Sequence, residues 1–191
     1  MARYELYVNG EKVTEHRGGY SRSFVDITQY LSEGENTLVM MVDSTENPDI
    51  PPFGYTIDYM CFGGIYRDVN LYLAEDIWIE NLLVRYELNG NEAILYPELQ
   101  TGNAGGAFDG KVTVKLSAPN GSMVKTYSQT VSFAAGHGKA VMEKVNVGEI
   151  TRWDMDNPCL YTVQVSVEKD GTVQDDKSAR IGFRTVECRP D

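Results

Sequence analysis

The sequence is poor in the residues that build disulfide frameworks and metal sites. It contains three cysteines, Cys61, Cys159 and Cys188, and two histidines, His16 and His137. The odd number and wide separation of the cysteines, with no CxxC pair, argue against a disulfide framework. Neither histidine has Cys, Asp or Glu neighbours at metal-ligand spacing. We therefore expect no metal site, and we interpret both histidines as loop or surface residues.

Positive charge and long apolar runs are also scarce. Lysine and arginine number 17 against 28 acidic residues, which gives a formal charge of −11. A chain this acidic is repelled by phosphate backbones and anionic lipids, which argues against nucleic-acid and membrane-surface binding. The longest apolar run, Leu38–Val42, is far shorter than the roughly 20 residues of a membrane-spanning helix. Hydrophobic residues nevertheless make up 42% of the chain, enough to build a folded core.

The sequence leaves the cellular compartment open. No apolar stretch of the kind found in signal peptides follows Met1–Glu5. These first residues are more typical of a chain that begins within a strand. Cysteines without partners suit either a reducing compartment or a secreted protein that does not need bridges.

Most of the chain shows a strand pattern. Alternate positions are apolar in several segments, so each segment can bury one face: Leu38–Val42, Val84–Leu88, Val112–Leu116 and Val163–Val167. Turn-forming residues separate such segments and predict hairpins: Asn9–Gly10, Asn89–Gly90, Pro119–Gly121 and Asp170–Gly171. Helical periodicity is poor, and Asp26–Leu31 favours at most one helical turn. The sequence therefore predicts an all-β fold.

A domain boundary is predicted near residues 74–79. The segment Asp68–Leu73 is typical of the last strand of a first domain, residues 1–75, which is too short for a typical eight-stranded jelly roll. The strands from Ile79 onward form a second domain, residues 76–187, of the size of an immunoglobulin-like β-sandwich. We expect the first domain to be truncated at its front, which would leave Tyr4–Val8 as an unpaired sheet edge.

Groups for catalysis are hard to find in this sequence. No Gly-x-Ser-x-Gly elbow is present. The acidic pairs Asp154–Asp156 and Asp175–Asp176 follow turns. Because acidic residues are abundant throughout, we interpret both pairs as solvated loops rather than as acid/base pairs.

One segment, Pro51–Asp68, combines dense aromatic residues with glycine, proline and an embedded carboxylate, Asp58. It is too aromatic for a solvated linker and too rich in glycine and proline for a strand interior. Aromatic rings stack on the apolar face of a pyranose, and a carboxylate accepts hydrogen bonds from two hydroxyls. The segment is therefore either a sugar-facing loop or a loop that packs its aromatic residues into its own domain.

Short motifs occur in a fixed order along the chain: Tyr7–Val13, Gly18–Tyr20 with Phe24–Thr28, Gly34–Leu38 with Val42–Asp43, Gly63–Val69, Trp153 with Asn157–Tyr161, and Gly182–Arg184. In this order they resemble glycoside hydrolase family 2, which includes β-galactosidases, β-glucuronidases and β-mannosidases. The resemblance covers about residues 4–186. Each motif is weak alone, but their common order makes the resemblance specific.

This resemblance implies a jelly-roll sugar-binding domain, an immunoglobulin-like domain and a catalytic (β/α)₈ barrel. It implies hydrolysis with retention by two barrel glutamates, so we assign no catalytic residue in this chain. Asn91–Glu92 is like the family's acid/base pair, but it follows a turn, and we interpret it as a coincidence. Asp58 lies five residues before Gly63, at the spacing of a family Asp that holds sugar hydroxyls. Arg67 and Asp68 also match, and we interpret them as structural.

We therefore predict a non-catalytic N-terminal β-domain fragment of a β-galactosidase-like glycosidase, which shapes the active-site wall and braces the barrel. The expected partners are a carbohydrate, in the complete enzyme, and the chain's own barrel domain; we expect no cofactor. The preferred glycoside and the oligomeric state are left open. One alternative is a stand-alone carbohydrate-binding or adhesion module. Another is a scaffold that associates through its open sheet edge.

Overall fold

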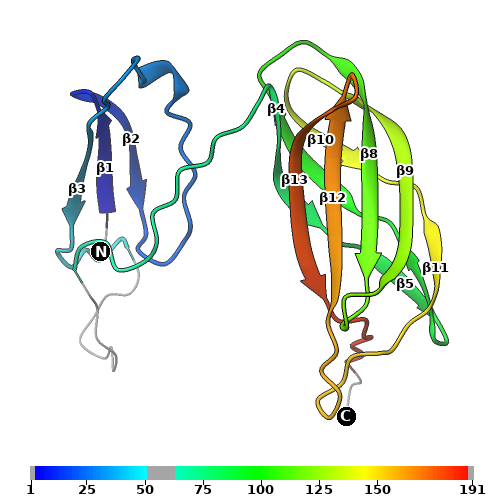
Figure 1. Cartoon of the computed structure of the whole chain (residues 1–191). Coiled ribbons are helices and arrows are strands. Elements are labelled where there is room, and N and C mark those ends of the chain that lie inside the picture. The colour runs from blue at the N-terminus through cyan, green and yellow to red at the C-terminus, as the bar shows by residue number, and fades with distance from the viewer. Residues whose placement is uncertain (1–2, 51–62, 189–191) are drawn as a thin grey trace. The chain divides into compact units, whose positions relative to one another are not determined.

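The structure is a computed structural model that describes residues 3–50 and 63–188. The chain divides into two units, Met1–Leu71 and Tyr72–Asp191, and each is described by itself. Within the described residues the regular structure consists of β-strands and one 3₁₀ turn (Figure 1). The predicted all-β fold is therefore confirmed. No helix among these residues has the length and apolar character needed to cross a membrane.

The first unit is built on a three-stranded antiparallel sheet in the order β2-β1-β3. Its strands are β1 (Arg3–Val8), β2 (Glu11–Arg17) and β3 (Leu38–Asp43). The predicted Asn9–Gly10 hairpin joins β1 to β2, and both turn residues have the positive φ that a tight turn needs, 51° and 88°. The expected helical turn is a 3₁₀ helix, η1 (Thr28–Tyr30). One face of β1 carries the buried side chains of Tyr4, Leu6 and Val8.

Two predictions for the first unit are wrong. Tyr4–Val8 is not a sheet edge, because β1 is the central strand and pairs with both β2 and β3. Alternation within one strand reports its buried face but not how many neighbours it has. The segment Asp68–Leu73 is not a strand. No strand of the described residues lies alongside it to satisfy its backbone, and Val69 and Leu73 are 69% and 89% exposed.

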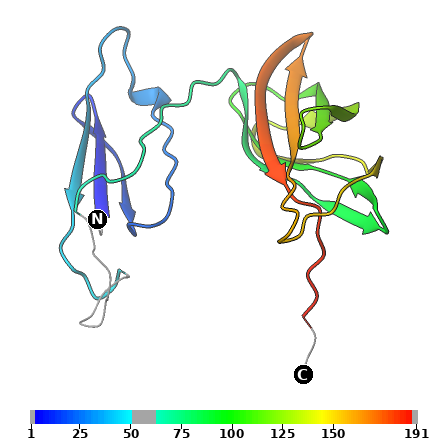
Figure 2. The same cartoon turned by 60° about the horizontal axis from the view of Figure 1, so that its bottom comes forward.

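The second unit is a sandwich of two β layers (Figure 2). One layer is a four-stranded sheet in the order β13-β12-β8-β9. The other layer consists of two three-stranded pieces in the orders β10-β7-β4 and β11-β6-β5. The strands are β4 (Ile77–Leu83), β5 (Tyr86–Asn89), β6 (Glu92–Leu95), β7 (Glu98–Asn103), β8 (Phe108–Ser117), β9 (Met123–Phe133), β10 (Gly136–Val141), β11 (Val145–Glu149), β12 (Tyr161–Lys169) and β13 (Thr172–Ile181).

The two three-stranded pieces form one layer that is interrupted around Pro97. Proline has no N–H for a ladder hydrogen bond. The strand is therefore interrupted at Pro97, which lies between the end of β6 and the start of β7. Hydrogen bonds cross the interruption, from the Tyr96 N–H to the Arg85 carbonyl (3.0 Å) and from the Met142 N–H to the Pro97 carbonyl (2.9 Å). The three predicted hairpins of this unit are confirmed, since they join β5 to β6, β8 to β9 and β12 to β13. The predicted immunoglobulin-like sandwich is thus the observed architecture.

Side chains of β13 pin the bulged edge strand β4. The ladder between β4 and β7 shifts register between Ile79 and Asn81, which leaves backbone groups without ladder partners. The Asp175 carboxylate accepts a hydrogen bond from the Ile79 N–H (2.7 Å). The Lys177 ammonium donates to the carbonyls of Ile79 (3.1 Å) and Glu80 (2.7 Å). The interpretation of Asp175–Asp176 as a solvated loop is therefore wrong: both residues lie in β13.

Glu98, the first residue of β7, is buried, with only 5% of the residue exposed. The Lys139 ammonium lies 2.6 Å from its Oε1, and the Arg85 Nε lies 3.1 Å from its Oε2. The hydrogen-bonding Lys139, aided by Arg85, holds the pKa of Glu98 below its usual value. A buried carboxylate with two cationic partners favours the folded state only while it is ionised.

We expect Glu98→Gln to destabilise the second unit at neutral pH and to cost progressively less as the solution is acidified. A lowered folded-state pKa gives stability that is present above the unfolded pKa of about 4.3 and is lost as the pH falls through the folded value. Thermal unfolding of both proteins between pH 7 and pH 3 measures the difference. Exposed Glu143→Gln is the matched control, and a pH-independent cost of Glu98→Gln would contradict the assignment.

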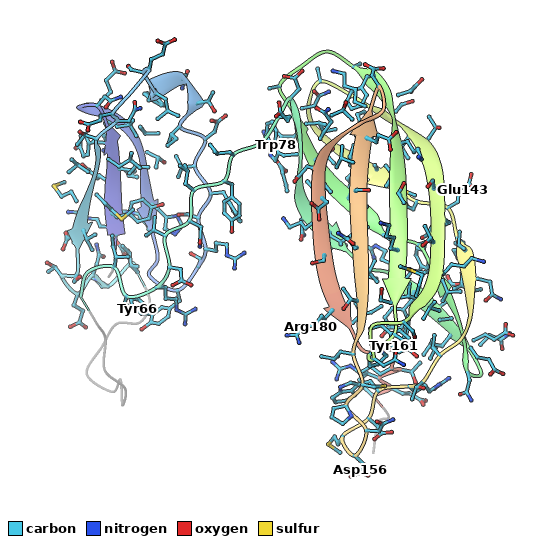
Figure 3. The ribbon with its side chains drawn as sticks, viewed as in Figure 1. Tyr66, Trp78, Glu143, Asp156, Tyr161 and Arg180 are labelled. Carbon is cyan, nitrogen blue, oxygen red and sulfur yellow. The ribbon has the colours of Figure 1, made fainter. Side chains whose placement is uncertain are left out.

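Trp78 packs directly over a glycine of the neighbouring strand. Trp78 of β4 is paired with Gly102 of β7, and a Cβ added at Gly102 would collide with the indole ring. Figure 3 labels Trp78 near the start of the second unit. The absence of a side chain at Gly102 is therefore what allows the indole ring to cover the strand.

Gly102→Ala is expected to lower the free energy of unfolding by about 1–3 kcal/mol, because the indole must leave its rotamer or the strands must separate. Gly106→Ala is the control, since its added Cβ meets no atom within 4 Å. Urea unfolding of the two variants gives the comparison. Equal stabilities would show that the Trp78 ring shifts without cost.

Candidate functional site

The predicted sugar contact, Asp58, lies outside the described residues, as does most of the aromatic segment Pro51–Asp68. The described part of this segment begins at Gly63. Gly63 lies beside the end of β3, because a Cβ at Gly63 would be 3.3 Å from the Ser44 Oγ. The segment that carries the predicted contact therefore re-enters the described structure at the end of the sheet where β3 finishes.

Two of the motifs meet at this end of the sheet. The Tyr66 hydroxyl donates a hydrogen bond to the Gly19 carbonyl (3.3 Å). Tyr66 belongs to the Gly63–Val69 motif, and Gly19 belongs to the Gly18–Tyr20 motif that follows β2. The Arg67 guanidinium lies 5.6 Å from the centre of the Tyr66 ring. The hydrogen bond of Tyr66 thus connects two segments that lie 47 residues apart in sequence.

The loop after β2 is tied to the sheet by polar contacts. The His16 Nε2 lies 3.1 Å from the Ser21 Oγ, and the Tyr4 hydroxyl is hydrogen-bonded to Ser23. The rings of Tyr4 and His16 are 5.5 Å apart. His16 therefore connects β2 to the loop that follows it. These contacts hold the loop beside Tyr66 in a defined position.

Asp43 shapes the turn that leads from β3 toward the aromatic segment. Its Oδ1 accepts the Thr45 N–H (2.9 Å), and its Oδ2 lies 2.9 Å from the Arg3 Nη2. The hydrogen bond from Thr45, together with Arg3, lowers the pKa of Asp43. Asp43 therefore stays ionised at neutral pH and fixes the turn that precedes the segment.

Exposed aromatic rings belong to the same two segments. Tyr20 is 53% exposed, Phe24 70% and Tyr66 39%, and such rings can stack on the apolar face of a sugar. Tyr20 and Phe24 were not selected as site residues from the sequence, although both lie in the motif Gly18–Thr28. A nearby hollow lined by Arg3–Glu5 and Glu15–Arg17 has a volume of about 30 Å³, room for about one water molecule rather than a sugar.

The opposite end of the sheet is organised by two asparagines. The Asn9 Nδ2 donates to the Tyr30 carbonyl (2.9 Å) and to the Asn36 Oδ1 (2.8 Å), while its Oδ1 accepts the Thr37 N–H (3.0 Å). The Asn36 amide in turn spans the Ser32 backbone, accepting its N–H (2.8 Å) and donating to its carbonyl (2.9 Å). These two motif asparagines therefore have an architectural role.

In the part of the chain that the structure describes, the other residues considered from the sequence lie in separate strands and turns. His137 lies in β10, not in the expected loop, and its exposed ring is 2.6 Å from the Glu80 Oε1. Asp154 accepts the N–H groups of Asp156 and Asn157 in an exposed turn. Glu92 is the first residue of β6 and follows the Asn89–Gly90 turn, as expected. Within residues 3–50 and 63–188, no group of three His, Cys, Asp or Glu side chains is arranged to hold a metal ion.

Comparison with known families matches both units. Residues 1–75 match the model of "Glycosyl hydrolases family 2, sugar binding domain". Residues 77–184 match the model of "Glycosyl hydrolases family 2". The second match alone covers more than half of the chain, and the two matches follow one another in the order that the motifs predicted.

Similar proteins include much longer glycosidases. A β-galactosidase of Thermoanaerobacter pseudethanolicus is 34% identical over 98% of this chain and 25% of its own length. A putative β-glucuronidase of Formosa agariphila is 32% identical over 97% of this chain and 22% of its own length. The crystal structure of Bacteroides uniformis β-glucuronidase superposes with a TM-score of 0.82 at 26% identity, over 96% of this chain and 23% of that protein. The chain therefore spans about a quarter of the curated relatives it matches.

Asn9→Ala is expected to destabilise the first unit by about 2 kcal/mol. It removes three hydrogen bonds, each contributing roughly 0.5–1.5 kcal/mol, and it places alanine at a positive φ. Amide hydrogen exchange in β1 and β3 measures the loss within this unit. Exposed Asn70→Ala is the control, and equal exchange in the two variants would contradict a central role for Asn9.

Proposed function

Because the chain belongs to glycosyl hydrolases family 2, we propose that it forms the sugar-binding domain, residues 1–75, and the immunoglobulin-like domain, residues 76–187, of a β-galactosidase-like retaining glycosidase. The observation that carries the proposal is the order of the two family matches, together with motif segments that meet at Tyr66 and Gly19. The relatives are about four times longer than this chain, which supports a role within a larger enzyme.

In this proposal the first domain supplies one wall of the sugar site. Asp58 accepts hydrogen bonds from two sugar hydroxyls, as the family resemblance implies. The exposed rings of Tyr20, Phe24 and Tyr66 offer apolar faces near the same segment, and hydrophobic stacking on a pyranose complements a carboxylate that holds its hydroxyls.

The chemical step belongs to the proposed barrel domain. Retaining hydrolysis requires one carboxyl group as acid/base and a second as nucleophile about 5–5.5 Å away. We assign neither group to this chain. Its contribution is to hold Asp58 at the mouth of the barrel and to brace that barrel through the second domain.

Asp58→Ala in the complete enzyme is expected to lower kcat/KM for 4-nitrophenyl β-galactoside roughly 10- to 150-fold. This corresponds to a loss of about 1.5–3 kcal/mol of transition-state stabilisation, because a charged hydrogen-bond acceptor for the sugar is lost. Asp68→Ala is the matched control, since Asp68 is interpreted as structural. Steady-state kinetics of both variants measures the difference. A change within about twofold for Asp58→Ala would refute the assigned contact.

Two further results decide between the proposed functions. Hydrolysis of a β-glucuronide in place of the β-galactoside would keep the glycosidase and change its sugar. Calorimetric titration of the 191-residue chain with galactose tests the binding-module alternative. Millimolar or tighter binding by this chain, combined with inactivity of the complete protein on both substrates, would replace the enzyme proposal.

A further inference from the structure

The residues that follow the last strand are held by one tyrosine hydroxyl. Tyr86 of β5 places its hydroxyl 3.1 Å from the carbonyl oxygens of Gly182 and Arg184, and 3.1 Å from the Arg184 N–H. The hydroxyl can donate its single proton to a carbonyl while its lone pair accepts the Arg184 N–H. It therefore connects the backbone of Gly182 and Arg184 to β5, although these residues lie 96 and 98 positions away from Tyr86 in sequence.

Aromatic rings enclose the same three residues. Phe183 is fully buried, with the ring of Tyr86 at 5.0 Å and that of Tyr161 at 5.1 Å, both edge-on. Figure 3 labels Tyr161 at this end of the sandwich. Such edge-to-face arrangements are favourable for aromatic pairs. Phe183 therefore fixes the depth at which the segment lies.

Trp153 closes the other side of the segment. Its backbone N–H donates to the Phe183 carbonyl (2.9 Å), and a Cβ at Gly182 would lie 2.7 Å from its ring. The Arg184 guanidinium lies 4.9 Å from the centre of the Trp153 ring. We call Tyr86 of β5, Trp153 of the loop between β11 and β12, and Tyr161 of β12 the exit clamp.

The hydroxyl of Tyr86 adds something that the core does not need. Phenylalanine would fill the same space beside Phe183, and β13 is already paired with β12 along its length. Among the described residues, the hydroxyl forms hydrogen bonds only with backbone groups of the segment that leaves the sandwich. Beyond the clamp the chain runs outward from the end of β13 (Figure 2), with Val186 78% exposed.

We propose that Tyr86 is a positioning residue whose hydroxyl sets the direction in which the chain leaves the second unit, and that it thereby orients the domain joined there. This inference rests on the proposed function for the existence of that domain. A rigid exit restricts the following domain to a narrow range of orientations, and small displacements of positioning groups reduce catalysis strongly.

The direct test measures the exit direction in this chain. Nitroxide labels are placed at Val173→Cys on β13 and Val186→Cys beyond the clamp, with the native cysteines replaced by serine, and their distance distribution is recorded by pulsed electron resonance. We expect one narrow distribution in the parent and a distribution at least about twice as wide with Tyr86→Phe, because the backbone loses its hydrogen-bond partner.

Tyr127→Phe is the matched control. The Tyr127 hydroxyl is buried without a hydrogen-bond partner among the described residues, so its removal takes away no positioning contact. Thermal unfolding of both variants shows whether a broadened distance distribution comes from a general loss of stability or from the lost contacts of the Tyr86 hydroxyl. An unchanged width with Tyr86→Phe, or equal broadening with Tyr127→Phe, overturns the inference.

The complete enzyme provides the second readout. Tyr86→Phe is expected to raise KM for 4-nitrophenyl β-galactoside about three- to tenfold, with a smaller change in kcat, because the orientation of the proposed barrel on the exit segment is less restricted. Unaltered KM with a broadened distance distribution overturns the orienting role. Absence of all glycosidase activity in the parent enzyme refutes the proposed function, while the distance measurement still decides whether the clamp sets the exit.

Discussion

The pairing of β8 with β12 is the contact on which the second unit depends. Val112, Val114 and Leu116 lie opposite Val167, Val165 and Val163, and all six are fully buried. Each such side chain contributes on the order of 1.5–3 kcal/mol when removed from water. The apolar ladder gives the sheet one dry face, against which the other layer must pack. The bulge contacts of Asp175 and Lys177, the Glu98 ion pairs and the exit clamp all join elements whose positions this packing fixes.

The sequence predicted the features that arise from neighbouring residues. Asn9–Gly10 and Asp170–Gly171 form turns because both residues of each pair adopt positive φ, and alternating valines form strands because their period matches the pleat. Features that depend on distant partners were missed. The central place of β1 is decided by β3, which begins thirty residues after β1 ends. The role of Asp175 depends on a bulge in β4. The expected strand Asp68–Leu73 does not form, since no strand of the described residues pairs with it.

Motif residues of the first unit divide into two kinds. Asn9 and Asn36 hold backbone segments together at one end of the sheet, so their presence in the motifs is explained by architecture. Gly19 and Tyr66 meet at the other end, beside exposed aromatic rings. The sequence alone could not separate these kinds, because both appear as short patterns rich in Gly, Asn and aromatic residues. Asp58, the predicted sugar contact, still rests on the family resemblance.

The outer edges of the two units differ in a way that affects how the chain behaves in solution. Edge strand β13 carries four charged residues, Asp175, Asp176, Lys177 and Arg180, and charges on an edge strand discourage pairing with another chain. Edge strand β3 instead presents Leu38, Val39 and Met41, each more than half exposed, within an uninterrupted apolar run. Strands of this kind favour intermolecular pairing as protein concentration rises. Of these two edges, β3 is therefore the one that favours association between copies of the isolated chain.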